Sequence, residues 1–206
     1  MLPFLLFALL SADFYLIFVH APVEATQGLV QKIFYFHVSS AFAMYAGFLL
    51  AGLFAILYLI KKEERWNRLS HAGVSVGLVF CSMVLASGPI WAKPIWGTWW
   101  TWDPRLTTTL LIWLIFVAVL LLRKFYGPDP RGKTFASVLT LFGLLDIPLI
   151  FFAVKLWRGI HPSVLGQESN MPGEMKLALI FTNVTILILF GVLYWVRYRT
   201  LKIEEA

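Results

Sequence analysis

The sequence predicts an all-α integral membrane protein, built as a bundle of six transmembrane helices. Hydrophobic residues make up 60% of the chain, against about 45–50% in ordinary soluble proteins. Charged residues make up 14%, against about 25%. Six apolar runs approach or reach the roughly 20 residues that a helix needs to cross a bilayer. A chain of 206 residues cannot bury that much apolar surface in its own core, so the surplus requires a lipid environment.

The six predicted spans form a single membrane domain over residues 1–206. They cover residues 2–19, 38–60, 72–91, 106–122, 135–154 and 177–196. Only Asp13 and Asp146 place a formal charge inside any of them. Barrel strands are excluded because they would alternate apolar and polar residues over about 10 positions. The first span lacks a basic leader and a small-residue cleavage site, which favours a retained helix over a signal peptide.

The basic residues predict the orientation of the bundle. The loops between spans 2 and 3 and between spans 4 and 5, together with the C-terminal tail, carry 11 of the 17 Lys and Arg residues. Positively charged loops stay in the cytoplasm, so both termini are expected there and the loop between spans 3 and 4 outside. Because the charge of +6 lies in short loops between apolar runs, we do not expect nucleic-acid binding. The single cysteine, Cys81, excludes an intrachain disulfide and cysteine-based metal or haem motifs.

The loop between spans 3 and 4 contains the segment WGTWWTWD, residues 96–103, with four tryptophans in seven residues. A belt of interfacial tryptophans would be spread over all helix ends. Clustered indoles offer wide, rigid faces and polar N–H edges, which suit a large, flat, apolar ligand. Haem is the natural candidate. A ligand that must later leave favours a loop site in the interface over a buried pocket.

Three histidines lie on the predicted outer side. His37 falls in KIFYFHVSS at the start of span 2, and His161 falls in WRGIHPS after span 5. Neutral imidazole is a common axial ligand of haem iron, so these two residues on either side of the tryptophan loop form a candidate pair. His20, at the end of span 1, is the competing second ligand. Each of them is alternatively an ordinary solvated histidine.

Haem propionates would require cations, and arginine offers bidentate geometry. The candidates on the outer side are Arg105, Arg158, Lys93 and Lys32. Each is alternatively a flanking residue that snorkels to the interface.

Two aspartates have structural interpretations. Asp103 followed by Pro104 is typical of a helix start, with aspartate as the N-cap and proline at the first helical position. Asp146 lies inside span 5 near Pro148. An ionisable group in a span suggests function, but here satisfaction of backbone donors freed by the proline is the favoured interpretation.

The run WAKPIWGTWWTWDPRLTTTLL, residues 91–111, resembles the tryptophan-rich WWD signature of haem-handling membrane proteins. Together with KIFYFHVSSA and the segment from Asp146 to His161, it resembles the CcmC-type haem exporter family of cytochrome c maturation. The resemblance covers nearly the whole chain. Two departures are Asp146, where a neutral amide is expected, and an N-terminus that begins almost directly with the first span.

The resemblance implies that haem b is bound non-covalently and transiently at the outer face of the inner membrane. His37 and His161 match the axial ligands of the iron. It also implies delivery to a membrane-anchored haem chaperone, beside the ATPase and permease of an ABC transporter and a small single-span subunit. The chaperone would supply its own histidine for covalent capture, so we name no catalytic residue. The remaining positions that match the signature, or that serve it, are Trp91, Trp96, Gly97, Trp99, Trp100, Trp102, Asp103 and Arg105.

Alternative functions are distinguishable. A b-type redox cytochrome would usually carry histidines inside its spans, and a substrate channel would line several spans with polar groups. A structural docking subunit of an exporter, with no haem site of its own, is also consistent with the sequence.

Overall fold

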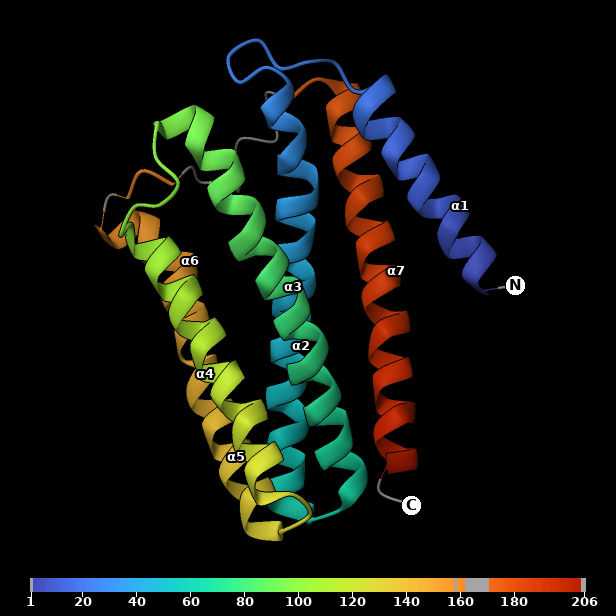
Figure 1. The fold of residues 1–206 in the computed structure, drawn as a ribbon, viewed down its shortest axis with the longest axis vertical. Helices are drawn as coiled ribbons and strands as arrows, with labels where there is room; N and C mark the ends of the chain where they lie inside the picture. The colour runs from blue at the N-terminus through green and yellow to red at the C-terminus, as the bar shows by residue number, and fades with distance from the viewer. Residues whose placement is uncertain (1, 158, 162–170, 205–206) are drawn as a thin grey trace.

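The computed structural model confirms the all-α fold (Figure 1). It describes residues 2–157, 159–161 and 171–204. Within these residues, six helical segments are long and apolar enough to cross a membrane. The elements are α1 (Leu2–Tyr15), a π-helical turn (Leu16–His20), a 3-10 turn (Leu29–Lys32), α2 (Ile33–Lys61), α3 (Glu64–Trp96), α4 (Pro104–Tyr126), α5 (Pro130–Leu144), α6 (Asp146–Trp157) and α7 (Gly173–Glu204).

Several helices extend beyond their apolar runs, because polar residues continue the helix past the part that matches the bilayer. The clearest case is α3, whose predicted span ends at Trp91. The helix itself continues through Pro94. It ends at Gly97, which adopts the left-handed φ of 76° and donates its N–H to the Lys93 carbonyl at 3.0 Å. Glycine reaches this conformation without a steric penalty.

The fifth predicted span is divided into α5 and α6 around Leu145. Pro148 explains the break, because proline lacks the N–H that would continue the helical ladder and its ring clashes with the preceding turn. Asp146 begins α6 and is 4% exposed. The break therefore places a buried carboxyl at the junction of α5 and α6.

Helices α2 and α3 make the closest contact in the bundle at small residues. A Cβ built on Gly47 would lie 2.6 Å from the Cα of Gly77, and one on Gly73 would lie 2.8 Å from the Gly47 carbonyl oxygen. Small residues permit this approach of two membrane helices. Beside this contact, the rings of Phe48 and Phe116 stack at 3.8 Å. The centre of the bundle is therefore densely packed.

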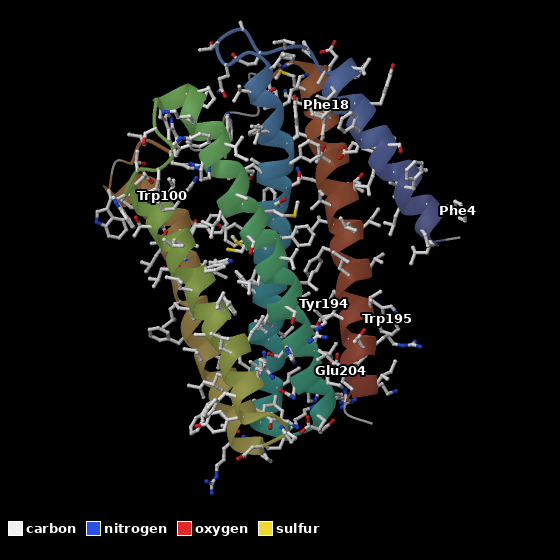
Figure 2. All side chains as sticks on the ribbon, in the orientation of Figure 1. Phe4, Phe18, Trp100, Tyr194, Trp195 and Glu204 are labelled. Atoms are coloured by element: carbon white, nitrogen blue, oxygen red, sulfur yellow. The ribbon has the colours of Figure 1, made fainter. Side chains whose placement is uncertain are left out.

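The connections between the helices are divided between the two ends of the bundle (Figure 1). At one end, which we call the basic end, lie the α2–α3 and α4–α5 connections and the end of α7. The opposite end, which we call the tryptophan end, carries residues 96–103 between α3 and α4. Figure 2 labels Trp100 there and Glu204 towards the basic end.

Helix α1 lies beside α7 at the edge of the bundle, and its first turns diverge from it (Figure 1). The side chains of Phe4 on α1 and Phe18 in the π-helical turn that follows it are 80% and 47% exposed (Figure 2). Asp13 is the buried residue of this helix, and its carboxyl shares a hydrogen bond of 2.7 Å with the Thr182 hydroxyl. The contact that positions α1 therefore combines apolar packing with one buried polar pair.

Candidate functional site

A cavity of about 610 Å³ lies at the tryptophan end, between α2, α3, α4 and α6. This volume falls within the roughly 300–1,000 Å³ typical of small-molecule and cofactor sites. It lies on the tryptophan side of the α2–α3 contact, and most of its lining is apolar. The polar residues that line it are Gln27, His37, Tyr45, Arg105, Thr109 and His161.

His37 and His161 come together in this cavity. His37 lies in the first turns of α2, and His161 follows α6. Their ring centroids are 6.5 Å apart, with an angle of 33° between the ring planes. His20 is exposed at the end of the π-helical turn and does not line the cavity. The structure therefore brings His37 together with His161 and not with His20.

The spacing of the two rings fits a metal ion held between them. Metal–imidazole bonds are about 2 Å long, so two of them place the ring centres roughly 6 Å apart, because each centre lies about 1 Å behind its nitrogen. The observed separation of 6.5 Å is close to this value. A cavity with apolar walls and two imidazoles at this distance fits an iron porphyrin.

An indole flanks each histidine. The Trp91 ring meets the His37 ring edge-on at 5.8 Å, and the Trp96 ring meets the His161 ring edge-on at 6.2 Å. Trp91 is held from the other side, because its Nε1 donates to Oε1 of Gln27 at 2.9 Å. Each imidazole therefore has an aromatic neighbour that restricts its ring orientation.

The tryptophans of the segment divide into two groups. Trp91, Trp96 and Trp100 line the cavity. Trp99 and Trp102 do not, and they are 57% and 76% exposed. The Trp102 ring packs edge-on against Trp100 at 6.0 Å. The indole cluster therefore has one face towards the cavity and another towards the surroundings of the protein.

The cavity is not confined to the interfacial loop. It extends between the helices as far as Met44 on α2 and Thr109 on α4. The sequence led us to expect a site in the loop, and the cavity beside this loop continues into the bundle. The divergence of α2 and α3 beyond their glycine contact opens this space, and such a divergence cannot be read from the pattern of either helix alone.

Asp103 is the N-cap of α4, as predicted. Its Oδ1 accepts the backbone N–H of Arg105 at 2.9 Å. Its second oxygen has a further role, because Oδ2 accepts the backbone N–H of Ile160 at 2.7 Å. Gly159 makes this approach possible, since a Cβ there would collide with the Asp103 carboxylate. One buried carboxylate therefore fixes both the start of α4 and the segment that carries His161.

Arg105 reaches the cavity and the second histidine. Its Nη1 lies 3.3 Å from Nδ1 of His161. Its Nε donates to the Ile150 carbonyl at 3.3 Å, and Nη2 donates to the Phe151 carbonyl at 3.5 Å. The guanidinium therefore connects α4, α6 and His161 beside the cavity.

The other predicted cations and Gly97 serve the local backbone and do not line the cavity. Lys93 donates from Nζ to the Gly97 carbonyl at 2.9 Å. Lys32, which is 3% exposed, donates from Nζ to the carbonyls of Ala21 at 2.5 Å and Pro22 at 3.1 Å. Arg158 lies outside the described residues. Among the three of these cations that lie in the described residues, Arg105 is the one that faces the cavity.

Sequence reasoning missed three residues that support the site: Gln27, Ser87 and Gly159. Ser87 lies 2.9 Å from Nδ1 of His37, measured to its Oγ. The signals for Ser87 and Gly159 were a small polar residue inside an apolar helix and a glycine two positions before His161. No local pattern distinguishes Gln27 from an ordinary loop residue.

Comparison with known proteins gives one family for the whole chain, and the relatives carry the same or a related name. A family model described as "Heme exporter protein C" matches residues 1–206, and so includes every segment that builds the cavity. Heme exporter protein C of Escherichia coli strain K12 is 29% identical over 187 residues, which cover 89% of this chain and 75% of that protein. The protein of the same name from Haemophilus influenzae is 29% identical over 191 residues, covering 90% and 76%. A "putative cytochrome c biosynthesis ccmC-like mitochondrial protein" of Marchantia polymorpha is 28% identical over 181 residues, covering 87% and 77%.

Proposed function

The chain belongs to the heme exporter protein C family, and from that premise we propose that it binds haem in the cavity at the tryptophan end. His37 and His161 are the axial ligands of the iron. The observation that carries this proposal is the pair of imidazoles 6.5 Å apart across a cavity of about 610 Å³. Haem is cargo here, bound non-covalently as haem b and released later.

We assign the side chains around the histidines to different parts of the haem and of its site. Trp91, Trp96 and Trp100 contact the faces and edges of the macrocycle, and Arg105 binds a propionate. Asp103 positions His161 through the backbone of Ile160, and Gly97 ends the helix that carries the first two indoles. Trp99 and Trp102, which face outward, contact haem only at the exposed mouth of the site.

We propose that the site faces the outside of the inner membrane and passes haem to a membrane-anchored chaperone. The support is the 11 basic residues in the two loops and the tail of the basic end, because positively charged loops remain in the cytoplasm. The names of the relatives refer to haem export and cytochrome c biosynthesis, and this supports delivery of haem to such a chaperone. The expected neighbours are the ATPase and permease of an ABC transporter and a small single-span subunit.

Absorption spectra of the purified protein in detergent test this proposal. The wild type, loaded with haem, should give a six-coordinate spectrum. His37→Ala and His161→Ala should each lose that spectrum, whereas His20→Ala should keep it. A variant of His37 or His161 that binds haem with an unchanged spectrum would remove that residue as a ligand.

Two further outcomes identify the alternatives. Absence of haem binding by the wild type, even with haem added in excess, would favour a docking subunit without its own site. Haem that binds but does not pass to an excess of a soluble haem-binding apoprotein would favour a resident redox haem over transfer.

A further inference from the structure

The two histidines differ in the hydrogen bonds at Nδ1, and the difference assigns their tautomers. At His37, Nδ1 lies 2.9 Å from the Ser87 hydroxyl. A hydroxyl has one proton, and two carbonyl oxygens, which can only accept, lie beside it: that of Met83 at 2.7 Å and that of Val84 at 3.4 Å. We assign the Ser87 proton to the shorter of these bonds, so the Ser87 oxygen accepts from His37 and the His37 proton lies on Nδ1. The Nε2 atom of His37 then carries the lone pair that a metal requires.

His161 has the opposite arrangement. Its Nδ1 lies 3.3 Å from Nη1 of Arg105. Guanidinium nitrogens only donate hydrogen bonds and stay protonated in proteins. Nδ1 of His161 must therefore be the acceptor, and the neutral ring carries its proton on Nε2. In this state His37 is ready to bind iron through Nε2, and His161 is not.

We propose that Arg105 controls the second axial bond: His37 binds the iron first, and His161 binds only after a haem carboxylate has taken the Arg105 guanidinium. The inference rests on the proposed function. When the guanidinium leaves, the ring gives its Nε2 proton to water and takes a proton from water at Nδ1, so the charge of the ring and the number of protons are both unchanged. The Arg105–Nδ1 hydrogen bond breaks, and a bond from Nε2 to iron forms.

Three of the contacts that Arg105 would exchange are weak. Arg105 lines the cavity, and its contacts to His161, Ile150 and Phe151 are 3.3–3.5 Å long with neutral acceptors. Hydrogen bonds at this length are weak. A carboxylate offers charge-assisted, bidentate bonds that are roughly twice as strong as neutral ones.

A second contact keeps His161 in place while Arg105 moves. The backbone N–H of Ile160, the residue before His161, is bound by Oδ2 of Asp103 and not by the guanidinium. The backbone N–H of Arg105, in the first turn of α4, is likewise bound by Asp103, through Oδ1. The guanidinium can therefore exchange partners without moving either backbone segment.

The first test is haem-free. Nitrogen-15 NMR of histidine-labelled protein reports the tautomer of each ring, and His37→Gln and His161→Gln assign the signals. We expect the proton of His37 on Nδ1 and that of His161 on Nε2. A His161 ring protonated on Nδ1 in the wild type would overturn the proposal, whether or not haem binds.

The second test compares haem with its dimethyl ester, which lacks free carboxylates. The wild type should give a six-coordinate spectrum with haem and a five-coordinate spectrum with the ester. Arg105→Met should become six-coordinate with both, and the control Lys93→Met should behave as the wild type. The five-coordinate ester spectrum should disappear in His37→Ala. A six-coordinate ester complex of the wild type would contradict the proposal.

The two tests separate this inference from the proposed function. If neither haem nor ester binds, the proposed function fails, and the NMR result still decides the tautomers. If haem binds with six-coordinate iron and the ester does too, the proposed function stands and the role of Arg105 falls. If the wild type takes up haem but no ester, the tautomer of His161 measured by NMR decides whether the proposed role of Arg105 stands.

Discussion

The two ends of the bundle use their polar side chains in opposite ways. At the basic end, Nη1 of Arg123 donates to Oδ1 of Asn67 at 2.6 Å in a buried contact. Beside it, Lys133 and Glu64 form an ion pair at 2.8 Å. At the tryptophan end, His37, His161 and Arg105 instead line the cavity. The contacts at the basic end join helices to one another, whereas the three side chains at the tryptophan end line a cavity that can hold a ligand.

This comparison separates the contacts that hold the fold from those that prepare the site. The Tyr194 hydroxyl, which lies towards the basic end in Figure 2, donates to the Leu69 carbonyl at 2.9 Å and joins α7 to α3. No residue of the proposed haem site takes part in these contacts. Changes at the basic end should therefore alter stability, and changes at the tryptophan end should alter haem binding.

The largest difference is expected between two helix caps. Asp103 and Asp129 both precede a proline and cap a helix, each through Oδ1 at 2.8–2.9 Å. Only Asp103 also holds Ile160. Asp103→Ala should lower haem affinity on the order of 10- to 100-fold, as is usual when a ligand loses its outer-shell support. Haem titration of both variants measures this effect.

Asp129→Ala is the matched control for the same cap. It should cost roughly 0.5–2 kcal/mol of stability and leave haem affinity unchanged. Gly159→Ala should reproduce the defect of Asp103→Ala, because its Cβ would collide with that carboxylate. Equal haem affinities in the two aspartate variants would contradict the positioning role of Asp103.

The next effect is on stability at the basic end. Asn67→Ala removes an acceptor from the buried guanidinium of Arg123, and a hydrogen bond to a charged group contributes about 1.5–3 kcal/mol. Unfolding in a titration with sodium dodecyl sulfate should show this loss. The haem spectrum should be unaltered, and a changed spectrum would show that the two ends are coupled.

A smaller effect should separate the inner and outer tryptophans. Trp96→Ala removes a ring that packs against His161, and such aromatic pairs contribute about 0.5–1.5 kcal/mol. Haem affinity should fall roughly 2- to 12-fold, since 1.4 kcal/mol is about tenfold. Trp102→Ala, at a ring that is 76% exposed, should have less effect. The reverse order would place the haem against the outer face of the cluster.

The smallest effect is expected for the half-exposed ion pair. Lys133→Gln removes the ion-pair partner of Glu64, whose side chain is 43% exposed and also accepts a hydrogen bond from Asn67 at 3.2 Å. Pairs in such positions contribute about 0–1 kcal/mol, because water screens them. The midpoint of unfolding should therefore shift little, and haem affinity should not change. A larger loss of stability than in Asn67→Ala would show that the ion pair stabilises this end more than the buried hydrogen bond of Arg123.

Some features of the fold and the site were predictable because they depend on neighbours in the sequence. The six apolar runs predict six helical segments, since a bilayer requires long apolar helices whatever their packing. The Asp103-Pro104 pair predicts the start of α4, because the cap acts on the next few backbone N–H groups. The break in the fifth span also has a local cause in Pro148, although residues 135–154 were predicted as one continuous span.

Other features were decided only by the tertiary structure, because they depend on distances between segments far apart in the sequence. The sequence by itself left His20 and His161 as competitors for the place beside His37, and it left all the clustered tryptophans equivalent. Helices α2 and α3 approach closely at Gly47 and Gly77 and diverge towards the tryptophan end (Figure 1). This divergence opens the cavity, and the positions of the two helices determine which rings line it. Periodicity within one helix specifies its apolar face, but not its separation from another helix.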